Sequence, residues 1–137
     1  MSPPQRIYPN FDTIDRRYNI IYADPPYSFR VHVNDNNGSR NARYFYNTMT
    51  DQDIIKLPIS KIAAPDCALF LWIPSPNLLL LNDIFNSWGF EFKTIAFNWV
   101  KTYPNSDKIR LGMGHYTRAG CECCFLATRG HLKVQSH

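Results

Sequence analysis

Long apolar runs are missing from this chain of 137 residues. A membrane-spanning helix needs about 20 consecutive apolar residues, and no run approaches that length. The N-terminus also lacks the apolar segment of a secretory signal peptide. From these two absences we expect an intracellular, cytoplasmic protein without a membrane partner.

Two common ligand-binding signatures are missing as well. No Gly-x-Gly-x-x-Gly sequence follows an apolar strand, so the fingerprint of dinucleotide binding is absent. The cysteines, which are Cys67, Cys121, Cys123 and Cys124, lack the pairs separated by two to four residues that zinc sites use. We interpret them as buried, reduced thiols and predict no metal site. A metal bound by Cys-x-Cys-Cys is the alternative.

The composition that remains is that of a globular domain. Apolar residues make up 45% of the chain and aromatic residues 15%, enough for one hydrophobic core. The net charge of +4 is compatible with a polyanionic partner but does not by itself indicate one. No repeat or low-complexity segment divides the chain. We therefore predict a single domain over residues 1–137, of which residues 1–17 form a lead-in.

Strand and helix patterns alternate along this domain. Continuous or alternating apolar runs predict four strands, at residues 18–23, 67–73, 90–100 and 121–128. Residues 77–88 have apolar side chains at helical spacing, and Gly89 follows as a stop. Thr50 is expected to cap a short helix that ends before Pro58. This order predicts an α/β protein with a doubly wound, mostly parallel sheet.

The first predicted strand stops at Asp24-Pro25-Pro26-Tyr27. Proline lacks an N–H group and biases the residue before it away from helix, so two prolines predict a rigid, extended turn. The turn lies at the carboxyl end of a strand, where open α/β sheets bind ligands. We expect the Asp24 carboxylate and outward-facing carbonyls of Asp24 and Pro25 to bind an exocyclic amine, while its planar base stacks on Tyr27. A plain surface turn is the alternative.

The segments after this turn resemble one family in their order along the chain. They are Tyr46-Asn47-Thr48-Met49-Thr50, Leu57-Pro58, Ala68-Leu69-Phe70-Leu71-Trp72, Trp88-Gly89-Phe90, Asn98-Trp99-Val100-Lys101, Gly112-Met113-Gly114-His115-Tyr116-Thr117-Arg118, Glu122 and Ala127-Thr128-Arg129-Gly130. Together with the Asp-Pro-Pro-Tyr turn, they resemble the MT-A70-like adenine-N6 methyltransferases over residues 18–130. The resemblance implies a Rossmann-like fold with permuted motif order and S-adenosylmethionine as the cofactor.

The resemblance also implies roles for individual residues. It makes Asp24, Pro25, Pro26 and Tyr27 catalytic, with the carboxylate and the proline carbonyls holding the adenine amine. It assigns cofactor binding to Ile7, Asp24 and Lys101. Arg6, which precedes Ile7, is expected near the same pocket. It assigns substrate binding to Tyr27, Arg43, Tyr46, Lys101, Arg110 and His115.

Several of these assignments have a structural alternative. Lys101 could be a solvated lysine at a strand end, and Tyr46 could be a core residue. The polar segment of residues 28–47 predicts a gate that brings arginines toward phosphates, or else a floppy insertion. The basic and glycine-containing segment of residues 103–118 predicts a mobile nucleic-acid contact, or else an exposed hairpin. Glu122 is expected to orient neighbouring polar groups rather than take part in the chemistry.

The chain departs from the family pattern at its C-terminus. In the permuted family a cofactor segment follows the catalytic motif, whereas this sequence ends at His137. We therefore expect a partial domain, either a fragment or a truncated relative that binds the cofactor poorly.

The partner expected from the resemblance is nucleic acid, with DNA favoured over RNA because no appended RNA-binding module is visible, and with a microbial or phage source. A homodimer or a heterodimer with a related subunit is a further expectation. One alternative is a non-catalytic, methyltransferase-like nucleic-acid-binding subunit. A second is methylation of cytosine N4 or of a glutamine amide.

Overall fold

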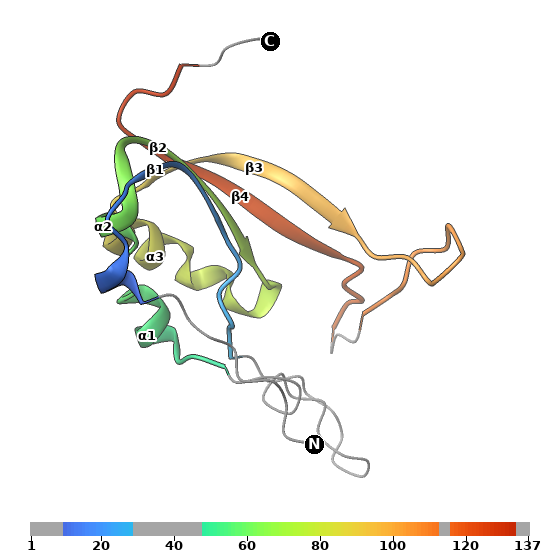
Figure 1. Ribbon diagram of the computed structural model, residues 1–137. Coiled ribbons are helices and arrows are strands. Elements are labelled where there is room, and N and C mark those ends of the chain that lie inside the picture. The colour runs from blue at the N-terminus through green and yellow to red at the C-terminus, as the bar shows by residue number, and fades with distance from the viewer. Residues whose placement is uncertain (1–9, 29–47, 113–115, 134–137) are drawn as a thin grey trace.

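The computed structural model describes residues 10–28, 48–112 and 116–133. In this part of the chain, four strands form one sheet in the order β1-β2-β4-β3 (Figure 1). The strands are β1 (Tyr18–Ala23), β2 (Ala63–Ile73), β3 (Glu91–Val100) and β4 (Cys121–Arg129). The helices are η1 (Phe11–Thr13), α1 (Asp51–Ile55), α2 (Ile59–Ile62), η3 (Ser75–Leu80) and α3 (Leu81–Trp88). The predicted α/β class is confirmed.

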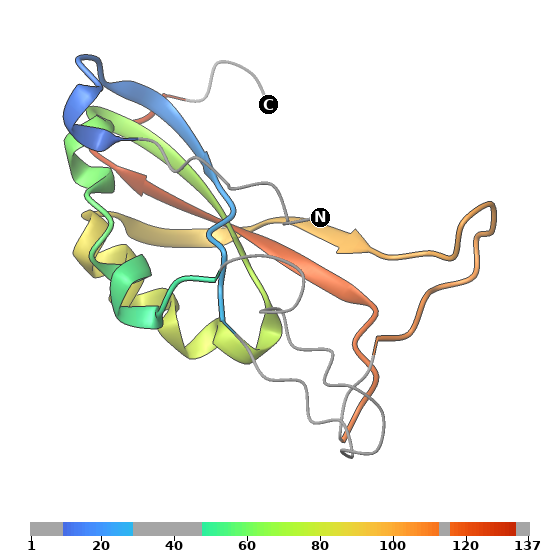
Figure 2. The same ribbon diagram turned by 60° about the horizontal axis from the view of Figure 1, so that its bottom comes forward.

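The sequence predicts a mostly parallel sheet, and this prediction is wrong for the described strands. β1 and β2 are parallel, but β4 runs antiparallel to both β2 and β3. Parallel neighbours need a crossover connection, usually a helix, whereas the segment between β3 and β4 lacks helical periodicity. β4 therefore returns beside β3 and pairs with it directly. Figure 2 shows residues 101–112 extending past the end of β3.

The helix boundaries follow local signals in the sequence. Thr50 caps α1 as predicted, since its hydroxyl accepts a bond from the Asp53 backbone N–H at 3.2 Å and donates one to the Asp53 carboxylate at 2.7 Å. Gly89 ends α3 with φ at +78°, in the left-handed region where glycine has no steric cost. The predicted helix over residues 77–88 is divided in two, because its first turn is the 3₁₀ helix η3 and only the remainder is α-helical.

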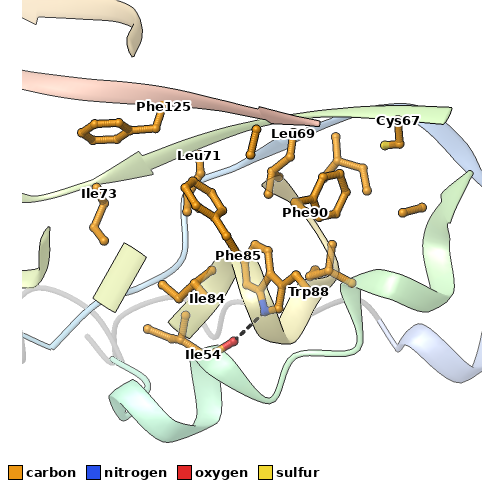
Figure 3. Close-up of a cluster of buried hydrophobic side chains, with 14 of the residues drawn as sticks. Ile54, Cys67, Leu69, Leu71, Ile73, Ile84, Phe85, Trp88, Phe90 and Phe125 are labelled. Carbon is orange, nitrogen blue, oxygen red and sulfur yellow. Dashed lines mark hydrogen bonds between the residues drawn. The ribbon is translucent and has the colours of Figure 1, made fainter. Parts of the chain in front are cut away.

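The core lies between the sheet and the helices of one layer (Figure 3). Trp88 of α3 is 1% exposed, and its indole N–H donates to the Ile54 carbonyl of α1 at 3.1 Å. This bond ties the two helices together, and Trp88 and Ile54 belong to the same hydrophobic cluster as Leu69 and Leu71 of β2. Burial of these large apolar side chains is the main source of stability in such a layer.

The opposite face of the sheet has no helix over it in the described residues (Figures 1 and 2). In β1, Ile21 is buried in the core, but Ile20 and Tyr22 are 67% and 65% exposed. Successive strand residues point to opposite faces, so this alternation identifies the two sides of the sheet. Residues 18–23 therefore form the predicted strand, but in the described structure only one of its faces is buried, and the exposed face carries Ile20 and Tyr22.

Candidate active site

The Asp-Pro-Pro-Tyr turn lies where the sequence predicts it, directly after β1. The Pro25 carbonyl accepts a bond from the Tyr27 N–H at 2.8 Å, and the Pro26 carbonyl accepts one from the Met49 N–H at 2.9 Å. Tyr27 and Met49 also form an isolated parallel bridge. Both prolines are buried and Asp24 is exposed. The turn is thus fixed by backbone bonds on two sides, with its carboxylate-bearing residue at the surface.

These bonds change one expectation about the carbonyls. The Pro25 carbonyl was expected to face outward, but it is engaged within the turn by the Tyr27 N–H. A carbonyl oxygen has two lone pairs, so Pro25 retains one acceptor site for another donor. The two prolines predict a rigid turn, and the bond from the Tyr27 N–H to the Pro25 carbonyl restricts the backbone further.

Tyr27 is placed differently from the exposed stacking surface that the sequence suggests. Its side chain is 2% exposed and belongs to the hydrophobic core cluster. Its hydroxyl has no hydrogen-bond partner within the described part of the chain. Burial, reinforced by the nearby Asp24 carboxylate, raises the pKa of the Tyr27 phenol far above its ordinary value. Tyr27 is therefore neutral and packed in this structure.

A cavity of about 490 Å³ opens beside the turn on the aromatic face of the sheet. Its volume lies in the range of about 300–1,000 Å³ that is usual for small-molecule sites. It is lined by Tyr22, Asp24, Trp72, Phe97, Asn98, Trp99 and Glu122. Four aromatic rings and two carboxylates therefore surround one cavity that reaches the Asp-Pro-Pro-Tyr turn.

Sheet pairing brings the aromatic lining together. Trp72 of β2 and Phe97 of β3 both pair with Cys124 of β4, so their side chains lie on the same face. The Trp72 indole N–H donates to the Tyr22 hydroxyl at 2.5 Å, which links β2 to β1 across the cavity wall. This bond orients the Trp72 and Tyr22 rings, which come from neighbouring strands.

Lys101 lies at the edge of this cavity. Its ammonium forms an ion pair with the Glu122 carboxylate and lies 4.9 Å from the centroid of the Trp99 ring. Both of these partners line the cavity. Lys101 thus contacts two residues that share the cavity lining with Asp24, and its role in cofactor binding stays a prediction.

The remaining predicted site residues are distributed unevenly. Arg110 is exposed, and its backbone N–H donates to the Lys101 carbonyl at 2.7 Å. Four predicted site residues, together with Arg6, lie outside the described residues: Ile7, Arg43, Tyr46 and His115.

Sequence reasoning missed most of the cavity lining as site residues: Tyr22, Trp72, Phe97, Asn98, Trp99 and Glu122. Most of the missed rings occupy alternate strand positions. The alternation of side chains between the two faces of a strand could have identified these rings, provided that the exposed face of the sheet was known.

All four cysteines are free thiols. Cys67 and Cys124 are buried, Cys123 is half-buried and Cys121 is exposed, so the prediction that all four are buried is wrong for Cys121. Burial raises the pKa of the Cys67, Cys123 and Cys124 thiols, which favours their neutral form. In the described ranges, no three His, Cys, Asp or Glu side chains are grouped as a metal site would need.

No described helix is long and apolar enough to cross a membrane.

The described α/β sheet, with this turn at the carboxyl end of its first strand, is consistent with a methyltransferase-like Rossmann fold. Within that class, the chain belongs to the MT-A70 family, whose profile matches residues 18–137. The resemblance inferred from the sequence is therefore confirmed.

Two curated relatives show how far the similarity extends. The type II methyltransferase M.MunI of Mycoplasma sp is 29% identical over 149 residues, which cover 96% of this chain and 59% of that protein. The human N(6)-adenine-specific methyltransferase METTL4 is 27% identical over 89 residues, which cover 63% of this chain and 17% of the human protein. The chain therefore spans only part of each relative's length.

Proposed function

We propose that this chain takes part in methyl transfer from S-adenosylmethionine to the N6 amine of adenine in DNA. The observation that carries the proposal is the rigid turn that holds the Asp24 carboxylate at the rim of an aromatic cavity. Membership of the MT-A70 family supports the reaction type. The name of the human relative supports the N6 amine of adenine as the target, and DNA rather than RNA is the expectation carried over from the sequence.

The lining of the cavity fits the proposed cofactor chemically. S-adenosylmethionine carries a sulfonium, an ammonium, a carboxylate and an adenine ring. Aromatic faces attract cations and stack on bases, and the Asp24 carboxylate complements positive charge. Asp24 and Lys101 are the charged residues that would hold the cofactor, with Tyr22 and Trp99 against its apolar parts. When bound, S-adenosylmethionine supplies an electrophilic methyl group.

Asp24 has the central chemical role in this proposal. Its carboxylate accepts one N–H of the adenine amine, and a backbone carbonyl of the turn accepts the other. These bonds withdraw the nitrogen lone pair from conjugation with the ring and direct it toward the methyl carbon. S-adenosylmethionine would supply the methyl group to this nitrogen, and Asp24 would hold the amine while the extra proton is released to water. The carboxylate bonds strengthen as positive charge develops on nitrogen, which is the differential stabilisation that catalysis requires.

Positioning supplies the rest of the rate enhancement. Holding the amine within about 3–3.5 Å of the methyl carbon, in line with the breaking bond, can account for several kcal/mol of the barrier. The bonds that the Pro25 and Pro26 carbonyls accept, from Tyr27 within the turn and from Met49 outside it, keep the turn that carries Asp24 in one place. The base is proposed to stack on Tyr27, and this requires the buried ring to become accessible when substrate binds.

The test combines cofactor binding with a methylation assay. S-adenosylmethionine is titrated into the chain by calorimetry, and labelled methyl transfer to duplex DNA is compared with transfer to RNA of the same sequence. Asp24→Asn is expected to lower transfer by about 100-fold or more, because it removes one preorganised charge-bearing acceptor. Asp15→Asn, at an exposed carboxylate 91% accessible, is the matched control and should transfer normally. Near-normal transfer by Asp24→Asn would refute the assignment of Asp24.

One alternative has an observation in its favour. The buried Tyr27 ring offers no stacking surface in this structure, which suits a methyltransferase-like subunit that binds nucleic acid without transferring methyl groups. DNA binding without cofactor binding would support this alternative.

Two expectations stay predictions. One is a homodimer or heterodimer, which sedimentation velocity tests, and the other is a cytoplasmic protein of microbial or phage source.

A further inference from the structure

The ion pair between Lys101 and Glu122 is built into the end of the β3–β4 ladder. Trp99 and Glu122 are cross-strand partners, and the Lys101 N–H donates to the Gly120 carbonyl at 2.9 Å, which extends the pairing by one residue. The Lys101 carbonyl accepts the Arg110 N–H at 2.7 Å on the other side. The backbone of Lys101 is thus held from both sides, and its side chain lies diagonally across from Glu122.

Glu122 connects this pair to the cavity. Its side chain lines the cavity that also contains Asp24, while its carboxylate binds the Lys101 ammonium. The ammonium lies 4.9 Å from the Trp99 ring centroid, within the range of a cation–π contact. A lysine ammonium has three donors, so it can bind a second carboxylate without releasing the first.

We propose that Glu122 is a positioning residue that holds the Lys101 ammonium at the cavity edge, where it binds the carboxylate of S-adenosylmethionine. This inference rests on the proposed function. Lysine is a flexible side chain that loses considerable rotamer freedom when it is ordered. Glu122 and Trp99 order it before the ligand binds, so the ligand does not have to do so.

Exposure separates this role from a purely structural one. The Lys101 and Glu122 side chains are 38% and 37% exposed, and ion pairs at such accessible positions contribute little to folding stability. Removing the Glu122 charge should therefore leave the melting temperature nearly unchanged while it weakens ligand binding. The pair between Glu91 and Lys93, at 2.8 Å on the same strand, does not line the cavity and offers a matched control.

Calorimetry with two ligands tests the proposal. S-adenosylmethionine and its decarboxylated analogue, which lacks the carboxylate, are titrated into the wild-type chain and into Glu122→Gln, Glu122→Asp, Lys101→Met and Glu91→Gln. We expect Glu122→Gln to weaken S-adenosylmethionine binding about tenfold, with partial recovery in Glu122→Asp, because a charge-assisted bond is worth about that factor. Binding of the decarboxylated analogue should change little, and Glu91→Gln should bind both ligands normally. Glu122→Gln combined with Lys101→Met should bind no more weakly than Lys101→Met alone.

Each other outcome has a definite meaning. Wild-type binding by Glu122→Gln, with a loss in Lys101→Met, would overturn the role of Glu122 and leave the proposed function intact. Equal losses for both ligands, or a large fall in melting temperature, would show that Glu122 acts on the fold and would also overturn the inference. If the wild-type chain binds neither ligand, the proposed cofactor site fails and this inference fails with it.

Discussion

The unpartnered hydroxyl of Tyr27 makes a quantitative test of the turn and its packing. The phenol is 2% exposed, and its oxygen has no hydrogen-bond partner in the described structure. Leaving a buried polar group unsatisfied costs about 1–3 kcal/mol. Tyr27→Phe removes this group and leaves only a small void, so we expect the free energy of unfolding to rise by about 1 kcal/mol at neutral pH.

The pH dependence of this difference provides a second, independent prediction. The phenol pKa is raised in the folded state, so the neutral form stabilises the fold and its contribution is lost as pH rises above the unfolded value of about 10. Above that pH, the wild-type chain should lose up to about 1.4 kcal/mol per pH unit relative to Tyr27→Phe. The buried thiols titrate in both proteins, so their effects cancel in the comparison.

Urea unfolding at pH 7.5 and at pH 11 measures both quantities. Tyr18→Phe is the control, because Tyr18 is 41% exposed and its substitution should change stability by less than about 0.5 kcal/mol. Destabilisation by Tyr27→Phe, or a difference that stays constant between the two pH values, would refute the reasoning. In the methylation assay, Tyr27→Phe should keep its activity while Tyr27→Ala binds the base more weakly than it binds the cofactor.

Three further predictions concern packing, backbone conformation and thiol reactivity. Trp88→Ala should lower the free energy of unfolding by about 3–5 kcal/mol, measured in urea, because a buried ring and its N–H bond are both lost. Gly89 and Gly130 both have positive φ, but a Cβ at Gly89 meets open space whereas one at Gly130 collides with oxygen atoms of neighbouring residues. Gly89→Ala should therefore cost about 1 kcal/mol and Gly130→Ala clearly more, and equal melting temperatures would contradict this difference. Iodoacetamide at neutral pH should modify the exposed Cys121 and spare the buried Cys124 until the chain is unfolded, as mass spectrometry would show.

Local features of the chain were predictable because they depend on neighbouring residues. The strand before Asp24, the proline turn, the Thr50 cap and the stop at Gly89 all occur where the sequence places them. Each rests on a short-range cause, such as a missing N–H, a side-chain acceptor or freedom at positive φ. The family followed from the same short motifs, which the match over residues 18–137 confirms.

The sheet and the cavity were decided by contacts between distant segments. Nothing near Cys121 specifies that β4 lies between β2 and β3, because strand order depends on how all the hydrophobic faces are buried together. The same placement pairs Trp99 with Glu122 and sets Lys101 beside both. It also buried Tyr27, whose aromatic side chain suits a stacking surface and a core equally well. The sequence by itself determined the turn and its chemistry, whereas tertiary packing decided which side chains surround it.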